Sequence, residues 1–146
     1  MTTIYTGSFW EGGPANLVGL LKHPDDVTLM DGNDTNQVTT WSLRVYDEKS
    51  ATPDTAVWAL TAQDPAVDPT PFVTKTTGKY VLAAPNGYNF LKTIRHDESD
   101  GSVAFSSVIV GGNTYRFELV IISPDALLDN ATWVWVGEAE SRSTPN

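Results

Sequence analysis

The stretch DESDGSVAFSSVIVGGNTYRFELVI, residues 97–121, carries the clearest indication of fold in this chain. Apolar and polar residues alternate in it twice, first over residues 103–109 and then over residues 115–121. Such alternation is typical of a half-buried β-strand, because successive side chains of a strand point to opposite faces of its sheet. Gly111 and Gly112 separate the two runs and favour a chain reversal. The stretch therefore predicts two strands that pair with each other.

Similar short runs recur along the chain. They are TTWSLRVYD at 39–47, TAVWAL at 55–60, GKYVLAAP at 78–85, YNFLKTI at 88–94 and ATWVWVGE at 131–138. Sequences rich in Asp, Gly, Asn and Pro lie between them, as turns require. We therefore predict an all-β fold, a single antiparallel β-sandwich of the Ig-like, Greek-key type. Short helices are predicted at 123–130 and 13–24, where a proline stands near the first helical position.

Length and composition predict one domain with extensions. The chain has 146 residues, of which 40% are hydrophobic and 18% charged. That is enough to bury one core and too little for a second independent domain. We expect an extended N-terminal arm at 1–26, with room for a short helix, a β-sandwich at 27–138 and a polar tail at 139–146. The proline-rich segment 61–78 is expected to be an extended surface loop.

The net charge of −9 makes nucleic acid and membrane surfaces unfavourable partners, since both carry negative charge. The chain contains no cysteine, which removes disulfides, thiol nucleophiles and thiolate metal sites. The N-terminal sequence MTTIYTGSFWEGGPANL lacks a basic start followed by an unbroken apolar run. We therefore expect synthesis as a soluble cytoplasmic protein without a secretory signal.

Two acidic turns raise the question of a metal site. In HDESDG, Asp97, Ser99 and Asp100 or Gly101 could offer oxygen atoms to calcium. In MDGNDTNQ the corresponding residues are Asp31, Asn33 and Thr35. Calcium takes six to eight oxygen ligands, and an EF-hand loop needs a distal bidentate Glu that neither turn has. We therefore interpret both segments as solvated turns and expect no metal ion.

No catalytic motif stands out. The two histidines, His23 and His96, lie far apart, and neither has a second histidine at zinc-binding spacing. A Gly-x-Ser-x-Gly nucleophile elbow is absent. The 18 acidic residues are compatible with paired catalytic carboxylates without indicating them. We expect a non-enzymatic protein without a cofactor.

Trp133 and Trp135 lie two residues apart, so on a strand they share one face while Val134 and Val136 share the other. Such a pair of indoles could form a sugar-stacking platform. A strand that is apolar on both faces is more often covered on both, which favours a core or subunit contact. Both interpretations remain open from the sequence.

Phe9 and Trp10 precede a double glycine near the N-terminus. An aromatic pair on an N-terminal arm could anchor in a pocket of a neighbouring subunit, or fold back onto its own sandwich. The candidate protein-contact residues are therefore Phe9, Trp10, Trp133 and Trp135.

The segments DGSVAFSSVIVGGNTYRFELVI and WSLRVYDEKS resemble parts of the Ig-like and transthyretin-like modules of bacterial surface proteins, including pilin and collagen-adhesin B-type repeats. That resemblance implies an extracellular adhesin or carbohydrate-binding module, which is our alternative hypothesis.

In style the chain is also similar to small β-rich accessory proteins of tailed-phage virions, such as capsid decoration or cement proteins, head fibres, and tail or neck components. This resemblance implies a non-enzymatic structural protein of the virion, made in the host cytoplasm, that binds and stabilises a capsid or tail assembly. Its partners would be the major capsid or tail protein or further copies of itself, so a homo-oligomer or multi-copy assembly is expected.

Overall fold

The computed structural model describes residues 4–25, 27–32, 34–63, 71–72 and 89–141. Within these ranges the chain forms seven strands and one short 3-10 helix. They are β1 (Ile4–Trp10), β2 (Ala15–Gly19), β3 (Thr40–Asp47), β4 (Trp58–Gln63), β5 (Phe90–Ile94), η1 (Phe105–Ser107), β6 (Thr114–Ile122) and β7 (Thr132–Glu140). The predicted all-β fold class is confirmed.

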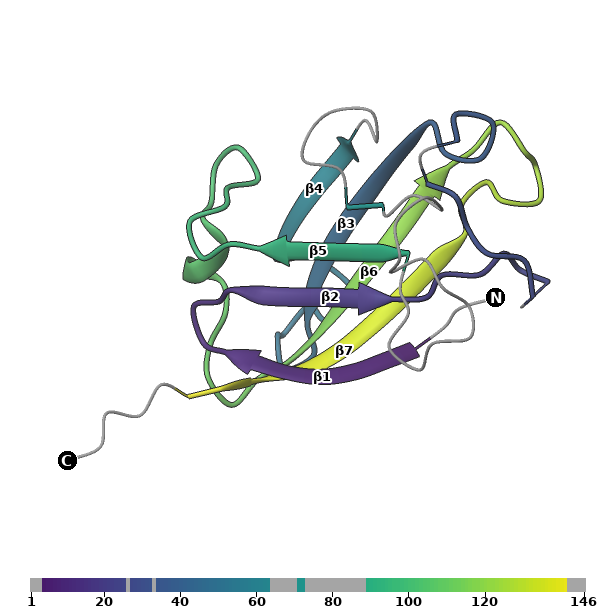
Figure 1. Ribbon diagram of the computed structural model, residues 1–146. Helices are drawn as coiled ribbons and strands as arrows, with labels where there is room; N and C mark the ends of the chain where they lie inside the picture. Colours follow the sequence, from purple (N-terminus) through teal and green to yellow (C-terminus); the bar gives the residue numbers. More distant parts are fainter. Residues whose placement is uncertain (1–3, 26, 33, 64–70, 73–88, 142–146) are drawn as a thin grey trace.

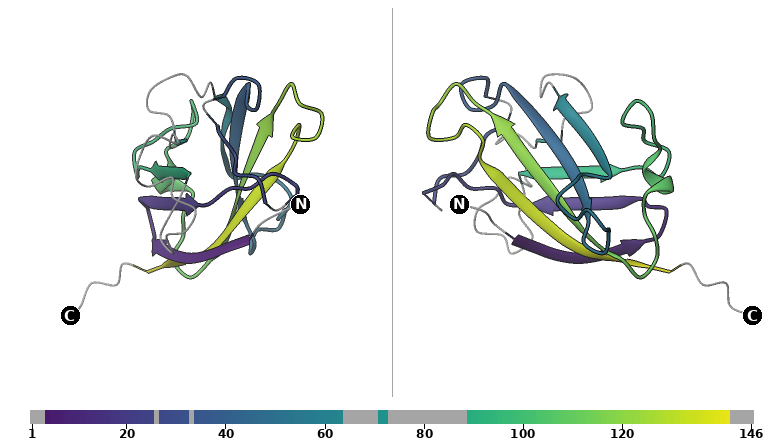
Figure 2. Two further views of the ribbon diagram at one scale, coloured as in Figure 1. Left: turned by 45° about the vertical axis from the view of Figure 1, so that its right-hand side comes forward. Right: turned by 180° about the vertical axis from the view of Figure 1, so that it is seen from behind.

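The strands form two sheets. The larger has five strands in the order β1-β7-β6-β3-β4, and the smaller pairs β2 with β5. Strand β1 runs parallel to β7, whereas every other pair is antiparallel. The two-stranded sheet lies across one face of the five-stranded sheet (Figure 1), and the left-hand view in Figure 2 separates them as two layers.

The core lies between these layers. On β6 the residues Tyr115, Phe117, Leu119 and Ile121 are buried, and the residues between them are only partly covered. From the opposite layer, the ring of Phe90 on β5 lies 5.3 Å from that of Trp135 on β7, centroid to centroid. We therefore call the covered side of the five-stranded sheet its inner face, and the other side its outer face.

Residues 103–109 do not form the strand that their alternation predicts. Ser99 and Ala104 form an isolated antiparallel bridge, Phe105–Ser107 forms η1, and a turn at Gly111 leads into β6. The Asp100 carboxylate accepts hydrogen bonds from the backbone N–H groups of Ser102 and Val103, which holds the chain in a turn. The predicted hairpin of residues 103–109 with residues 115–121 is therefore wrong, although β6 itself is present.

The N-terminal segment also differs from its prediction. Within residues 1–26, Ile4–Trp10 forms β1 and Ala15–Gly19 forms β2, so this part of the chain belongs to the sheets and is not an extended arm. The helix predicted at 13–24 is absent, because alternate residues of β2 are buried in a strand pattern. Residues 123–130 form turns and no helix, and β7 continues to Glu140, past the predicted start of the tail.

The Ig-like, Greek-key assignment stays a prediction, and two observations favour it. The order β7-β6-β3-β4 corresponds to the G-F-C-C′ order of variable-type immunoglobulin domains. The phenol of Tyr115, at the start of β6, donates to the carbonyl of Val108 at 3.1 Å and accepts from the N–H of Val110 at 2.7 Å. Such a tyrosine, bonded to backbone a few residues upstream, is a feature of that fold. The run predicted at 78–85 lies outside the described residues.

Candidate functional site

Trp133 and Trp135 lie on the inner face of β7. Their exposed fractions are 1% and 6%. Their indole N–H groups donate to the carbonyls of Lys22 at 3.2 Å and Val18 at 3.0 Å, in and just beyond β2. Both indoles are therefore used inside the fold, and neither offers a sugar platform or a subunit contact.

Phe9 also points into the core. Its ring centroid lies 5.4 Å from that of Phe117 in an edge-to-face arrangement and 6.0 Å from that of Tyr115. Edge-to-face aromatic pairs stabilise a core beyond the area that they bury. The ring of Phe9 therefore packs within its own chain, the second of the two alternatives, and its role in a contact with another subunit stays a prediction.

Trp10 is the one exposed residue among the four candidate contact residues, since Trp133 and Trp135 are buried and Phe9 is partly buried. It is the last residue of β1 and is 52% exposed, whereas the other four tryptophans of the chain are buried. The difference follows from strand geometry: Phe9 takes the inner face, so the next residue takes the outer face. Sequence alone could place the two aromatics on opposite faces of a strand, but β1 was not predicted as a strand.

Strand β1 forms one edge of the five-stranded sheet. All seven of its residues pair in unbroken register with β7, from Ile4 opposite Val134 to Trp10 opposite Glu140. The other edge is β4, whose pairing with β3 shifts register between Trp41 and Leu43, and Ala62 in it has a positive φ of 51°. A bulge with a left-handed residue twists an edge and makes it a poor template for another strand. Of the two edges, β1 is the regular one.

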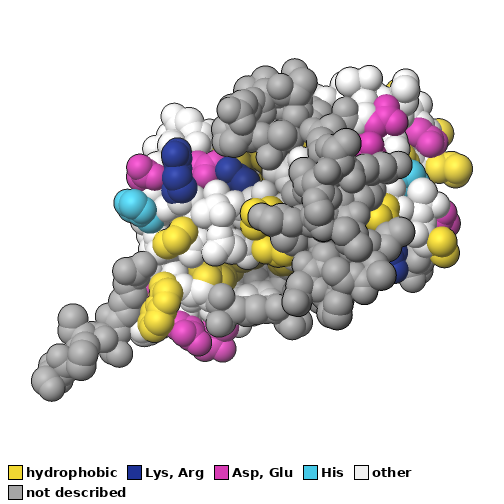
Figure 3. Space-filling model, in the orientation of Figure 1, with side chains coloured by type: hydrophobic (Ala, Val, Ile, Leu, Met, Phe, Trp, Pro, Cys, Tyr) yellow, Lys and Arg dark blue, Asp and Glu magenta, His cyan; other side chains and the backbone are white. Residues whose placement is uncertain are grey.

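Carboxylates surround the exposed end of β1. Glu138 and Glu140 are exposed on the outer face of β7, opposite Ser8 and Trp10 in the register. Glu11, the next residue after β1, accepts a hydrogen bond from the N–H of Gly111 at 3.3 Å. Figure 3 shows a hydrophobic side chain beside acidic ones where β1 ends, at the lower left. We call Trp10, Glu138 and Glu140 the β1 rim.

Arginine neutralises the acids further along the outer face. Arg116 on β6 donates to Glu118 at 2.6 Å and to Glu48 at 2.8 Å. Its guanidinium carbon also lies 4.5 Å from the ring centroid of Tyr46 on β3. The central strands of the outer face therefore satisfy their own charges, unlike the β1 rim.

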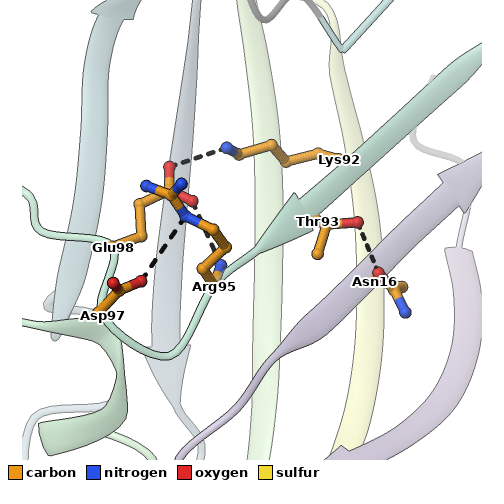
Figure 4. A network of polar contacts seen from close by, with 6 residues as sticks. All are labelled: Asn16, Lys92, Thr93, Arg95, Asp97 and Glu98. Carbon is orange, nitrogen blue, oxygen red and sulfur yellow. Dashed lines mark hydrogen bonds and ion pairs between the residues drawn. The ribbon is translucent and has the colours of Figure 1, made fainter.

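The acidic turn at 96–101 is a structural element. Lys92 of β5 forms an ion pair with Glu98 at 2.8 Å (Figure 4), and both side chains are largely covered. The Arg95–Asp97 pair, at 3.6 Å, is exposed. Hydrogen bonds from the N–H groups of Val103 and Ser102 lower the pKa of Asp100 below its usual value. Among the described residues no group of three His, Asp or Glu side chains could hold a metal ion.

The turn at 31–35 and His23 also make local hydrogen bonds. Asp34 accepts from the N–H of Asn36, and His23 shares a hydrogen bond of 3.0 Å with Gln37, whereas His96 is exposed. Asn33, the middle residue of this second metal candidate, lies outside the described residues. The interpretation of this segment as a solvated turn without a metal ion therefore stays a prediction.

Asn89 is a structural residue that the sequence pattern gave no reason to single out. It is fully buried before β5, and its Oδ1 accepts from the N–H of Leu21 at 2.6 Å. Its Nδ2 donates to the carbonyls of Leu21 and Met30, each at 2.9 Å. One side chain thus fixes the loop after β2, and only a tertiary contact reveals this.

Comparison with known proteins adds no family: no family model, curated protein or solved structure matches this chain. No helix in the described part of the chain has the length and apolar character needed to cross a membrane. The candidate site is therefore argued from its own residues, and it is the regular edge strand β1 with its rim.

Proposed function

We propose that this chain is a non-enzymatic structural protein that binds and stabilises a larger protein assembly. The resemblance to accessory proteins of tailed-phage virions favours a phage capsid or tail as that assembly. The observation that carries the proposal is the exposed Trp10 at the end of a regular edge strand, in a chain that buries its other four tryptophans. Tryptophan is strongly enriched among the residues that dominate protein–protein binding energy.

The composition agrees with this proposal. An acidic chain with a net charge of −9 is repelled by nucleic acid and by anionic lipid, and proteins remain as partners. In the alternative of an extracellular carbohydrate-binding or adhesin-type module, sugar binding depended on Trp133 and Trp135, and both are buried. We therefore do not carry the sugar-binding alternative further.

The direct test follows the protein through particle purification. Antibody to the chain is used to trace it through density-gradient purification of the phage particles made by cells that express the gene. We expect it to sediment with the particles at a constant copy number per particle. A chain that stays entirely in the soluble fractions contradicts the proposal.

Two variants locate the contact. Trp10→Ala should reduce the amount of particle-bound protein at limiting concentration, by about 30-fold in affinity if Trp10 is a dominant contact. Leu127→Ala is the matched control, because Leu127 is an exposed hydrophobic residue of the loop between β6 and β7. Loss of binding in the Leu127 variant with full binding in the Trp10 variant would place the contact elsewhere.

A further inference from the structure

We propose that the outer edge of β1, which pairs with no further strand among the described residues, accepts an extended basic segment of the partner subunit as an additional strand. This inference rests on the proposed function and names the site and the chemistry of the partner. The added strand would pair with the backbone of Ile4–Trp10, and its Lys or Arg side chains would reach the carboxylates of the β1 rim.

The backbone of β1 fits strand addition. Edge strands that must stay unpaired usually carry lysine, proline or a bulge. The sequence IYTGSFW contains no charged residue and no proline, and all of its residues hold an unbroken register with β7. The opposite edge, β4, carries the register shift and the positive φ of Ala62. The two edges of one sheet are thus unequal, and β1 is the one able to template a further strand.

The carboxylates beside β1 favour an added strand that carries basic side chains. Glu138 and Glu140 lie one strand from the outer edge, and no Lys or Arg among the described residues lies within ion-pair distance of either. The nearby cations are engaged: Arg116 binds Glu48 and Glu118, and Lys49 donates to the carbonyl of Gly112 at 3.0 Å.

A lysine or arginine placed opposite Ser8 or Trp10 on an added strand would lie on the same face as Glu138 and Glu140, two strand spacings or about 10 Å away, so its long side chain and the glutamate can meet across β1. The exposed indole of Trp10 supplies a second attraction, since cations are drawn to the face of an aromatic ring. A second copy of this chain would bring another net charge of −9 and leave Glu138 and Glu140 without a counter-charge. Charge complementarity therefore favours a basic partner over self-pairing.

The experiment measures peptide binding to the purified protein by fluorescence polarisation. The probe is a labelled peptide of seven residues that alternates lysine with valine or threonine. A matched peptide carries glutamate in place of lysine, and a third keeps the lysines but has alternate backbone amides methylated. We expect binding of the first peptide only, together with slower amide hydrogen exchange in β1. Equal binding of the methylated peptide would overturn strand addition, and equal binding of the acidic peptide would overturn the charge argument.

Variants test the rim itself. Glu138→Gln with Glu140→Gln should weaken binding of the basic peptide about fivefold, the combined effect of two exposed ion pairs. The double variant Asp54→Asn with Asp97→Asn removes an equal number of negative charges, but away from β1. It should leave the affinity for the basic peptide unchanged. Ser8→Lys, which places a cation on the edge, should abolish binding. Equal effects of the two double variants would overturn the assignment of the site.

Sedimentation velocity of the free protein addresses self-pairing. We expect a monomer. A dimer that Ser8→Lys dissociates, combined with no peptide binding, would replace the basic partner by a second copy. Particle fractionation separates this inference from the proposed function: a chain that sediments with particles but binds no basic peptide leaves the function standing and removes only the inference.

Discussion

Trp135 and Trp10 lie on neighbouring strands, and their side chains point to opposite faces of the sheet. Trp135 on β7 points inward, with its ring against Phe90 and its indole N–H on the Val18 carbonyl. Trp10 on β1 points outward beside Glu140 and is half exposed. The same residue type thus joins two layers in one case and forms an open rim in the other. The composition gives only the number of tryptophans. The position of each one along its strand decides which face of the sheet it lies on, and therefore whether a partner can contact it.

The largest effect is expected at the inward tryptophan. Trp135→Ala should lower the free energy of unfolding by about 4 kcal/mol, because it empties a large buried volume between the sheets. Trp10→Ala should change it by less than about 0.5 kcal/mol, as is usual for exposed sites. Urea denaturation of both variants measures the difference. Equal losses in the two variants would break the comparison.

A second contrast concerns two asparagines near β2. Asn89→Ala should cost about 3 kcal/mol, since it leaves the N–H and carbonyl of Leu21 and the carbonyl of Met30 without their buried partner. Asn16, which accepts a hydrogen bond from the hydroxyl of Thr93 on the exposed side of the small sheet, is the control. Asn16→Ala should stay within about 0.5 kcal/mol in the same denaturation experiment. Similar stabilities for both variants would show that Asn89 does not hold the loop.

The ion pair between Lys92 and Glu98 is expected to have an intermediate effect. Glu98→Gln leaves a largely covered ammonium group without its counter-charge and should cost about 2 kcal/mol. Asp97→Asn, which removes the exposed partner of Arg95, should have almost no effect. Thermal unfolding of the two variants gives the comparison, and a stable Glu98→Gln variant would mean that solvent replaces the pair.

Tyr115→Phe should cost about 1 kcal/mol, the net value of the hydrogen bonds that its phenol makes with Val108 and Val110. Burial raises the pKa of this phenol above its ordinary value. The ring itself stays in the core, which keeps the change smaller than a truncation. Chemical denaturation measures it, and an unchanged midpoint would remove this support for the Ig-like assignment.

The smallest effect concerns Asp25, in the turn after β2. Hydrogen bonds from the hydroxyl of Thr28 and from the N–H groups of Val27 and Thr28 lower its pKa from 3.8 to about 2. Because the folded pKa is depressed, the stabilisation is present above pH 3.8 and is lost as the pH falls through about 2. Carboxyl titration by NMR should show this pKa, and Thr28→Ala should move it back toward 3.8. An Asp25 pKa that Thr28→Ala leaves unmoved would contradict the assigned cause.

The alternation of apolar and polar residues predicted the strands that bury one face and leave the other partly exposed. The runs at 39–47, 115–121 and 131–138 correspond closely to β3, β6 and β7, because one face of each strand packs on the core. The same pattern misled at 103–109, where the turn held by Asp100 directs the chain into η1 instead of a strand. Alternation reports which residues are suited to a strand, and a competing side-chain hydrogen bond can override it.

The N-terminal segment shows a second limit of prediction from local sequence. Strand β1 pairs in parallel with β7, more than a hundred residues later in the sequence, so no local signal fixes its position. The candidate site depends on that pairing: it turns Phe9 inward, turns Trp10 outward, and brings Trp10 opposite Glu140. Of the four predicted contact residues, the fold therefore buries Trp133 and Trp135, covers Phe9 in part and leaves Trp10 exposed.

The sequence by itself determined the all-β class, the positions of the central strands and the acidic character of the surface, because these follow from residue types and their spacing. The tertiary structure alone decided which edge of the large sheet is regular and which tryptophan is exposed, and it placed Asn89 on the loop after β2. Those features depend on pairings between distant segments. Such pairings are chosen by the summed burial of whole faces, which no short window of sequence contains.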